Sequence, residues 1–192
     1  MKKILGFVAV AALLAGCGGG GGNDIPPGYV ALGAEYLNQF NKLQGYQALP
    51  SGGVSTTFPA SNSANYTGSL SVVSDINDPN ARIAQGQANL TADFSGGGSV
   101  SGTAGGFYEY GVSDPNVRAV PGSATITSGG ISGANVTLNV SGNVELGGVN
   151  TSFSGAVGSA FYGPNADLLY GEQQNIAASG LNSTVDVVIL AD

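Results

Sequence analysis

Between residues 135 and 161 the sequence alternates apolar and polar residues with a period of two. From Asn135 to Leu146, valine and leucine fill the even positions except Gly142, and polar residues fill the odd ones. Successive side chains of a β-strand point to opposite faces, so one face of this segment belongs in a core and the other in water. The pattern predicts a long strand that is buried on one side.

A second strand follows at once. Gly147-Gly148 offers a tight turn, because glycine readily adopts the positive φ angles of two-residue hairpins. From Thr151 to Phe161 the apolar residues Phe153, Val157 and Phe161 recur on one face. The two segments therefore predict a hairpin.

Seven further segments have shorter or less regular strand patterns, separated by turn clusters of Gly, Asn and Pro. They are Tyr66–Val73, Ala88–Phe94, Ser99–Thr103, Phe107–Gly111, Ser123–Thr127, Gln173–Ala178 and Thr184–Leu190. With the hairpin this makes about nine segments, of which about eight close a small barrel. Closure also removes the exposed sheet edges that promote aggregation. The sequence predicts an all-β protein with a small antiparallel β-barrel over residues 65–192.

The segment before the barrel, residues 29–64, has a different pattern. Residues at helical spacing predict a short amphipathic helix over Glu35–Leu43, with a face of Val30, Ala34, Leu37, Phe40 (or Asn41) and Leu43. We expect this helix to plug or pack against one end of the barrel, and the rest of the segment to be a linker.

The N-terminus has the pattern of a secretion signal. Lys2 and Lys3 precede an apolar run, Ile4–Leu14, that is shorter than the roughly 20 residues of a transmembrane helix. The run ends in Leu-Ala-Gly-Cys at Cys17, which resembles the lipobox of bacterial lipoproteins. The resemblance implies a signal peptide over residues 1–16, cleavage before Cys17 and lipidation of that cysteine. An ordinary secretory signal with an incidental cysteine is the alternative.

Residues 17–28 then form a tether. Gly18–Gly22 are all glycine, which makes a flexible leash. Two or more acyl chains anchor a protein firmly to a membrane without a transmembrane helix. In the enteric sorting rule an Asp after the lipidated cysteine favours retention in the inner membrane, and Gly18 stands there instead. We therefore expect an outer-membrane location.

Composition excludes several functions. Removal of residues 1–16 leaves three basic residues, Lys42, Arg82 and Arg118, against all twelve acidic residues, a net charge of −9. Such a surface repels nucleic acid and anionic lipid headgroups. The chain has no histidine, and Cys17 is its only cysteine, so Ser-His-Asp and Cys-His catalysis and ordinary zinc sites are excluded. We predict no catalytic residue, no metal ligand and no cofactor.

A faint repeat marks two loops. Asp78-Pro79-Asn80-Ala81-Arg82 recurs 36 residues later as Asp114-Pro115-Asn116-Val117-Arg118. Asp and Pro in this order favour a type I turn. The repeat is interpreted either as two similar hairpin turns or as a pair of related binding loops.

The binding interpretation gives the candidate partner-binding residues. The loops 74–85 and 109–121 carry Arg82, Arg118 and Tyr110, and arginine and aromatic side chains often anchor interfaces. The two loops form one site only if they lie on the same rim of the barrel. The rival hypothesis is that the arginines brace the fold.

A second resemblance concerns the end of the Thr151–Phe161 strand. The run consists of Phe161, Tyr162, Gly163, Pro164, Asn165, Ala166 and Asp167, with Gly171 a few residues on. It is similar to a motif in the β-barrel domain of the transferrin-binding protein B family of outer-membrane lipoproteins. The resemblance implies a barrel over about Tyr66–Asp192 and a surface-binding role, with the motif itself structural. It does not imply transferrin as ligand, because the chain is too short for two lobes.

These observations predict an outer-membrane lipoprotein, exposed at the cell surface, that binds an unidentified protein or small ligand. A location on the periplasmic face stays open. One alternative is a structural or envelope-assembly lipoprotein without a discrete ligand. Another is a carrier that holds a small molecule inside the barrel, although bulky inward residues such as Phe107, Leu138 and Phe153 favour a filled interior.

Overall fold

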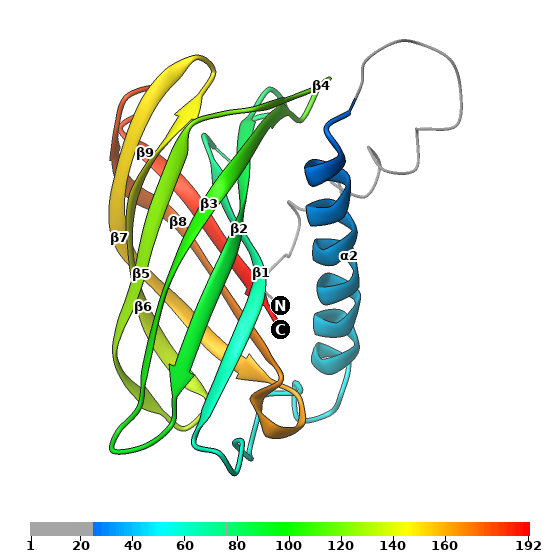
Figure 1. The fold of residues 1–192 in the computed structure, drawn as a ribbon, viewed down its shortest axis with the longest axis vertical. Helices are drawn as coiled ribbons and strands as arrows, with labels where there is room; N and C mark the ends of the chain where they lie inside the picture. The colour runs from blue at the N-terminus through cyan, green and yellow to red at the C-terminus, as the bar shows by residue number, and fades with distance from the viewer. Residues whose placement is uncertain (1–24, 76) are drawn as a thin grey trace.

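A computed structural model describes residues 25–75 and 77–192. These residues form an antiparallel β-barrel with one long helix, α2 (Pro27–Gln47), on its outer wall (Figure 1). The strands are β1 (Ser63–Val73), β2 (Arg82–Asp93), β3 (Ser99–Gly111), β4 (Asp114–Ala119), β5 (Gly122–Ser132), β6 (Asn135–Leu146), β7 (Val149–Tyr162), β8 (Leu168–Ser179) and β9 (Thr184–Ala191).

Eight of the strands close the barrel. They follow the order β2-β1-β9-β8-β7-β6-β5-β3, and the pairing of β2 with β3 completes the ring. The short strand β4 pairs with the last part of β3, beyond the part that pairs with β5. The predicted small antiparallel barrel of about eight strands is therefore confirmed.

We call the barrel end that carries the β1–β2, β3–β4, β6–β7 and β8–β9 connections the upper rim. The opposite end, with the β2–β3, β5–β6 and β7–β8 connections, is the lower rim. In Figure 1 the upper rim is at the top, and α2 runs from its start near the upper rim to its end near the lower rim.

The predicted hairpin is confirmed as β6 and β7. Their pairing runs without interruption from Asn135 opposite Ala160 to Leu146 opposite Val149. Gly147 and Gly148 form the turn with φ angles of 59° and 81°. Positive φ at both central residues is the requirement of a type I′ turn, which suits the right-handed twist of paired strands.

The interior of the barrel is filled by apolar side chains. Leu138, Val140 and Val144 of β6 are buried, as their alternation predicts. Phe153 and Phe161 of β7 join them in one continuous hydrophobic cluster to which the barrel strands contribute. This cluster is the core of the protein.

The prediction for the region of β3 was wrong in one respect. The sequence predicted two strands, Ser99–Thr103 and Phe107–Gly111, because glycines separate them, but the structure has one strand. Gly106 and Phe107 together face Gly86 of β2, and Gly106 has a φ of 63°. A glycine with positive φ in a β-bulge bends a strand without ending it, so the two segments stay continuous.

The two Asp-Pro-Asn copies differ in structure. The first lies in the β1–β2 connection, whereas the second begins strand β4 and is not the turn that the repeat predicted. What they share is a local hydrogen bond. The Asn80 amide donates to Asp78 at 2.8 Å, and the Asn116 amide donates to Asp114 at 3.0 Å. This Asx turn is compatible with both a loop and a strand entrance.

Helix α2 also differs from the prediction. It spans 21 residues rather than Glu35–Leu43, because proline at its start fits the first helical turn. It lies along the outside of β1, β9 and β8 rather than at one end of the barrel.

The buried face of the helix agrees with the prediction at Leu43 but differs from it elsewhere. Its buried residues include Tyr29, Tyr36 and Leu43, whereas Val30 of the expected face is exposed. The large rings of tyrosine bury more area than valine or alanine, so they decide which face turns inward.

A polar cluster fixes the lower half of α2 to the barrel. Lys42 Nζ lies 3.2 Å from a carboxylate oxygen of both Asp167 and Asp192. The Gln39 amide donates to Asp192 at 2.8 Å, and the Tyr46 hydroxyl donates to Asp167 at 2.8 Å. The helix and the C-terminal end of β9 are thereby held together.

The filled interior generates a stability prediction. Leu138→Ala should lower the free energy of unfolding by about 2–5 kcal/mol, because truncation of a buried leucine loses apolar burial and leaves a cavity. Urea unfolding measures the loss. The neighbouring exposed change Asn139→Ala is the matched control and should stay within about 0.5 kcal/mol. Equal effects of the two variants would mean that the faces of β6 are reversed.

Candidate functional site

The structure brings the two candidate loops together on the upper rim. The Val112 amide donates to the Ala81 carbonyl at 3.0 Å, and the Ser113 hydroxyl donates to the Pro79 carbonyl at 2.7 Å. The condition that both loops lie on the same rim is therefore met, because β3 is one strand and not two.

Both arginines meet at one buried carboxylate. Glu109 of β3 has no exposed side-chain surface, and its Oε1 lies 2.8 Å from Arg82 Nε, while its Oε2 lies 2.5 Å from Arg118 Nη2. Arg82 also pairs with Asp114 at 3.1 Å, and Arg118 pairs with Glu145 at 2.5 Å. We call these five residues the rim network.

The electrostatics of the rim network favour a bracing role. Burial raises the pKa of the Glu109 carboxyl, but hydrogen bonds from Arg82 and from the Gly147 amide outweigh burial and hold that pKa below its ordinary value. Carboxylates already neutralise both arginines, so little positive charge remains for an anionic ligand group. This geometry supports the hypothesis that the arginines brace the fold.

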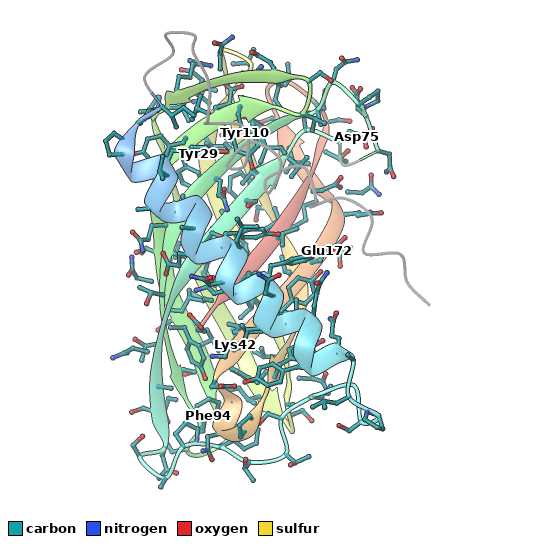
Figure 2. The ribbon with its side chains drawn as sticks, turned by 90° about the vertical axis from the view of Figure 1, so that its right-hand side faces the viewer. Tyr29, Lys42, Asp75, Phe94, Tyr110 and Glu172 are labelled. Carbon is teal, nitrogen blue, oxygen red and sulfur yellow. The ribbon has the colours of Figure 1, made fainter. Side chains whose placement is uncertain are left out.

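Tyr110 is not on the surface. Its side chain is fully buried beneath α2, where its ring lies 5.4 Å from that of Tyr29 in an edge-to-face arrangement. Figure 2 shows the two rings near the start of the helix. Tyr110 was a candidate partner-binding residue of the 109–121 loop, but it lies in β3 beneath α2 and has no free surface for a partner.

The motif at residues 161–167 connects the barrel to the segments around it. Phe161 lies in the core, and Gly163 turns the chain with a φ of 78°. The Tyr66 hydroxyl donates to the Ala166 carbonyl, and Asp167 holds Tyr46 of α2.

The remaining motif residues complete this turn. Tyr162 packs against the cluster beneath α2, while Pro164 and Asn165 lie in a short 3-10 turn, where the Asn165 amide donates to Thr57. These contacts support the structural role that the resemblance implied.

Buried or partly buried side chains lie near both ends of the barrel. At the upper end Glu109 of the rim network is fully buried. At the lower end the ring of Phe94 lies 4.9 Å from that of Phe58 and 5.1 Å from that of Phe161, and Figure 2 shows Phe94 at that end. The interior is thus packed rather than open to a ligand.

A groove of about 970 Å³ lies on the outside of the barrel towards the lower rim. Its lining comes from the ends of β5 and β6, from β7 and β8, and from Gln47 in the last turn of α2. Glu172, one of its residues, lies on the same face of the molecule as α2 (Figure 2). We call this feature the β7–β8 groove.

The groove coincides with a break in strand pairing. Ser154 pairs with Ala177 and Ser159 pairs with Gly171, but the residues between them on β7 and β8 are not paired with each other. Strand β8 also bulges against β9 in this region, where Asn175 has a φ of 58°. The regular pairing of β7 and β8 is therefore interrupted beside the groove.

Tyrosine and carboxylate groups shape one side of the groove. The Tyr170 hydroxyl donates to Glu172 at 2.6 Å, and the rings of Tyr162 and Tyr170 meet edge to face at 6.4 Å. Burial first, and then the hydrogen bond and charge of Glu172, raise the pKa of Tyr170 above its ordinary value. Its hydroxyl therefore stays protonated at neutral pH.

Sequence reasoning did not find this groove. Its residues come from four strands and a helix, and no single segment marks them. The one local signal is on the outward face of β7, where the small residues Gly158 and Ala160 are followed by Tyr162. That step from small to large side chains marks the edge of a depression only once the neighbouring strands are known.

The predicted signal peptide, Cys17 and tether residues 17–24 lie outside the described residues. Within the part of the chain that the structure describes, no helix combines the length and the hydrophobicity that a membrane span requires.

Comparisons with protein-family models, curated proteins and solved structures found no match for this chain. The eight-stranded barrel agrees with the fold that the resemblance to the transferrin-binding protein B family implied. Membership of that family stays a prediction.

The rim network predicts a loss of stability rather than a loss of binding for Arg82. Arg82→Ala should cost about 3 kcal/mol, the lower end of the range for removing one partner of a buried ion pair, because Arg118 still contacts Glu109. Arg118 is half exposed, so Arg118→Ala should cost less. Denaturant unfolding of both variants measures this order. An effect of Arg82→Ala below about 0.5 kcal/mol would contradict the bracing role.

The low pKa of Glu109 predicts a pH dependence. A carboxyl whose pKa is lower in the folded than in the unfolded state stabilises the fold above about pH 4.3 and loses this contribution as the pH falls through the folded-state pKa. The wild type should therefore be more stable than Glu109→Gln at pH 7, and the difference should shrink at about pH 3. Urea unfolding at both pH values tests this, and an unchanged difference would count against it.

Proposed function

We propose that this protein is a lipid-anchored outer-membrane lipoprotein that acts as a binding module at the cell surface. The observation that carries the binding role is the β7–β8 groove, the larger of the two depressions described in the barrel wall and its rim. Ligand sites are concave and carry a few placed polar groups. The packed interior disfavours the alternative of a carrier that uses the inside of the barrel.

The position of α2 supports the anchored arrangement. The helix begins at Pro27 near the upper rim, ten residues after Cys17. Ten extended residues span at most about 35 Å, which keeps the upper rim within reach of the membrane. The groove lies towards the lower rim, at the end of the barrel farther from the start of α2 and hence from the tether.

The net charge supports a polar surface site rather than contact with lipid headgroups. After cleavage the chain carries −9, and the three basic side chains are all paired with carboxylates. An anionic bilayer repels such a domain. The lipid on Cys17 is therefore the membrane contact that we propose, and the barrel stays free for a ligand.

Protease treatment of intact cells tests the location. We expect added protease to degrade the barrel of the wild-type protein while a periplasmic marker survives. Cys17→Ala should abolish palmitate labelling and remove the barrel from the surface, and Gly18→Ala is the matched control that keeps the cysteine. Palmitate labelling that persists in Cys17→Ala would end the lipoprotein proposal. A protected wild-type barrel would place the protein on the periplasmic face.

A further inference from the structure

The β7–β8 groove has a floor of small residues between taller walls. Gly158 and Ala160 of β7 form the floor, and a Cβ atom added at Gly158 would meet nothing within 4 Å. Gly158 has no positive φ, so its backbone does not require glycine. The missing side chain leaves open space that a ligand can occupy.

The walls combine aromatic rings with amide and hydroxyl groups. Tyr162 and Tyr170 stand on the side of α2, and Asn135 and Thr137 of β6 stand on the other side. Gln173 and Gln174 follow along β8, both exposed. Amide side chains and hydroxyls each offer donors as well as acceptors, so the groove can match a ligand that does the same.

Charge narrows the class of ligand. Among the described residues that line the groove there is no Lys or Arg, and the one carboxylate, Glu172, accepts a hydrogen bond from Tyr170. An anionic ligand would meet no positive group and a net charge of −9 on the mature chain. A cationic ligand would meet a single carboxylate that is already hydrogen-bonded. An apolar ligand would leave the amides of the walls without partners, which is costly.

A sugar fits the remaining description. The hydroxyls of a sugar both donate and accept hydrogen bonds. The C–H face of a sugar packs against an aromatic ring, and a tyrosine ring buries a large apolar area while its hydroxyl stays polar. The groove is open along the barrel wall rather than enclosed, which suits a chain of sugar units. We propose that the β7–β8 groove binds a neutral oligosaccharide, with the rings of Tyr162 and Tyr170 as apolar packing surfaces and Asn135, Gln173 and Gln174 as hydrogen-bonding groups. This inference deepens the proposed binding function and rests on it.

The test uses the mature lipoprotein, purified in a detergent without a sugar headgroup. It is applied to a panel of neutral glucans, mannans, galactans and N-acetylhexosamine oligomers, with sialylated and sulfated oligosaccharides as the anionic comparison. We expect at least one neutral oligosaccharide to bind with a Kd below about 1 mM by calorimetry, and the anionic set to bind more weakly.

Gly158→Phe is the blocking variant, because a Cβ atom at this position meets nothing within 4 Å and the ring beyond it would fill the floor of the groove. It should weaken binding at least about tenfold, since the ring occupies the volume that the sugar needs. Ser152→Phe adds the same ring to an exposed position on β7 outside the groove and should leave binding unchanged. If Gly158→Phe does not fold, Gln173→Ala and Gln174→Ala take its place, each with an expected loss of about fivefold, the equivalent of one hydrogen bond.

Three results would overturn the proposal. They are a lack of binding to every neutral oligosaccharide, binding that Gly158→Phe and the glutamine variants leave intact, and a preference for anionic sugars or for a polyamine such as spermidine. The assay uses purified protein and defined sugars. Its failure is therefore distinct from a failure of the anchor and surface location, which palmitate labelling and protease treatment of cells report.

Discussion

The filling of a closed eight-stranded barrel is the constraint on which the rest of the structure depends. A ring of this size leaves room for one layer of inward side chains, so inward positions must be apolar and must fit one another. Leu138, Val157 and Phe161 meet this requirement from neighbouring strands. Because the core is complete inside the ring, the outer wall is free to carry α2 on one part and a groove on another.

The chain has few charged residues, and most of those that the structure describes form ion pairs at the upper rim or between α2 and the barrel. Glu109, with two arginines, secures the upper rim, and Lys42 secures the lower half of α2 through Asp167 and Asp192. Burial of a carboxylate costs several kcal/mol unless partners compensate for it, so these residues act as paired sets. Among the described residues that line the β7–β8 groove, hydroxyl and amide groups outnumber the single carboxylate, Glu172, which suits neutral ligands.

The β7–β8 groove lies beside a local irregularity in strand pairing. The pairing of β7 and β8 is interrupted between Ser154 and Ser159, and β8 bulges against β9 near Asn175. Bulges are frequent beside binding sites because they redirect side chains. Beside this interruption in pairing, small residues of β7 lie between tyrosine and amide side chains. The proposed recognition of a sugar depends on this arrangement of small and large residues.

The sequence by itself determined the strands whose alternation is regular. The faces of β6 and β7 and the Gly147-Gly148 turn follow from side-chain parity and glycine conformation, which are local properties. Tertiary structure alone decided the rest. The bulge at Gly106 joined two predicted strands and so placed Arg82 and Arg118 on one rim, around Glu109, which is far from Arg82 in the chain. Contacts between segments that are distant in the sequence decide which side of α2 faces the barrel, bury Tyr110 and shape the groove. A local sequence pattern does not specify such contacts.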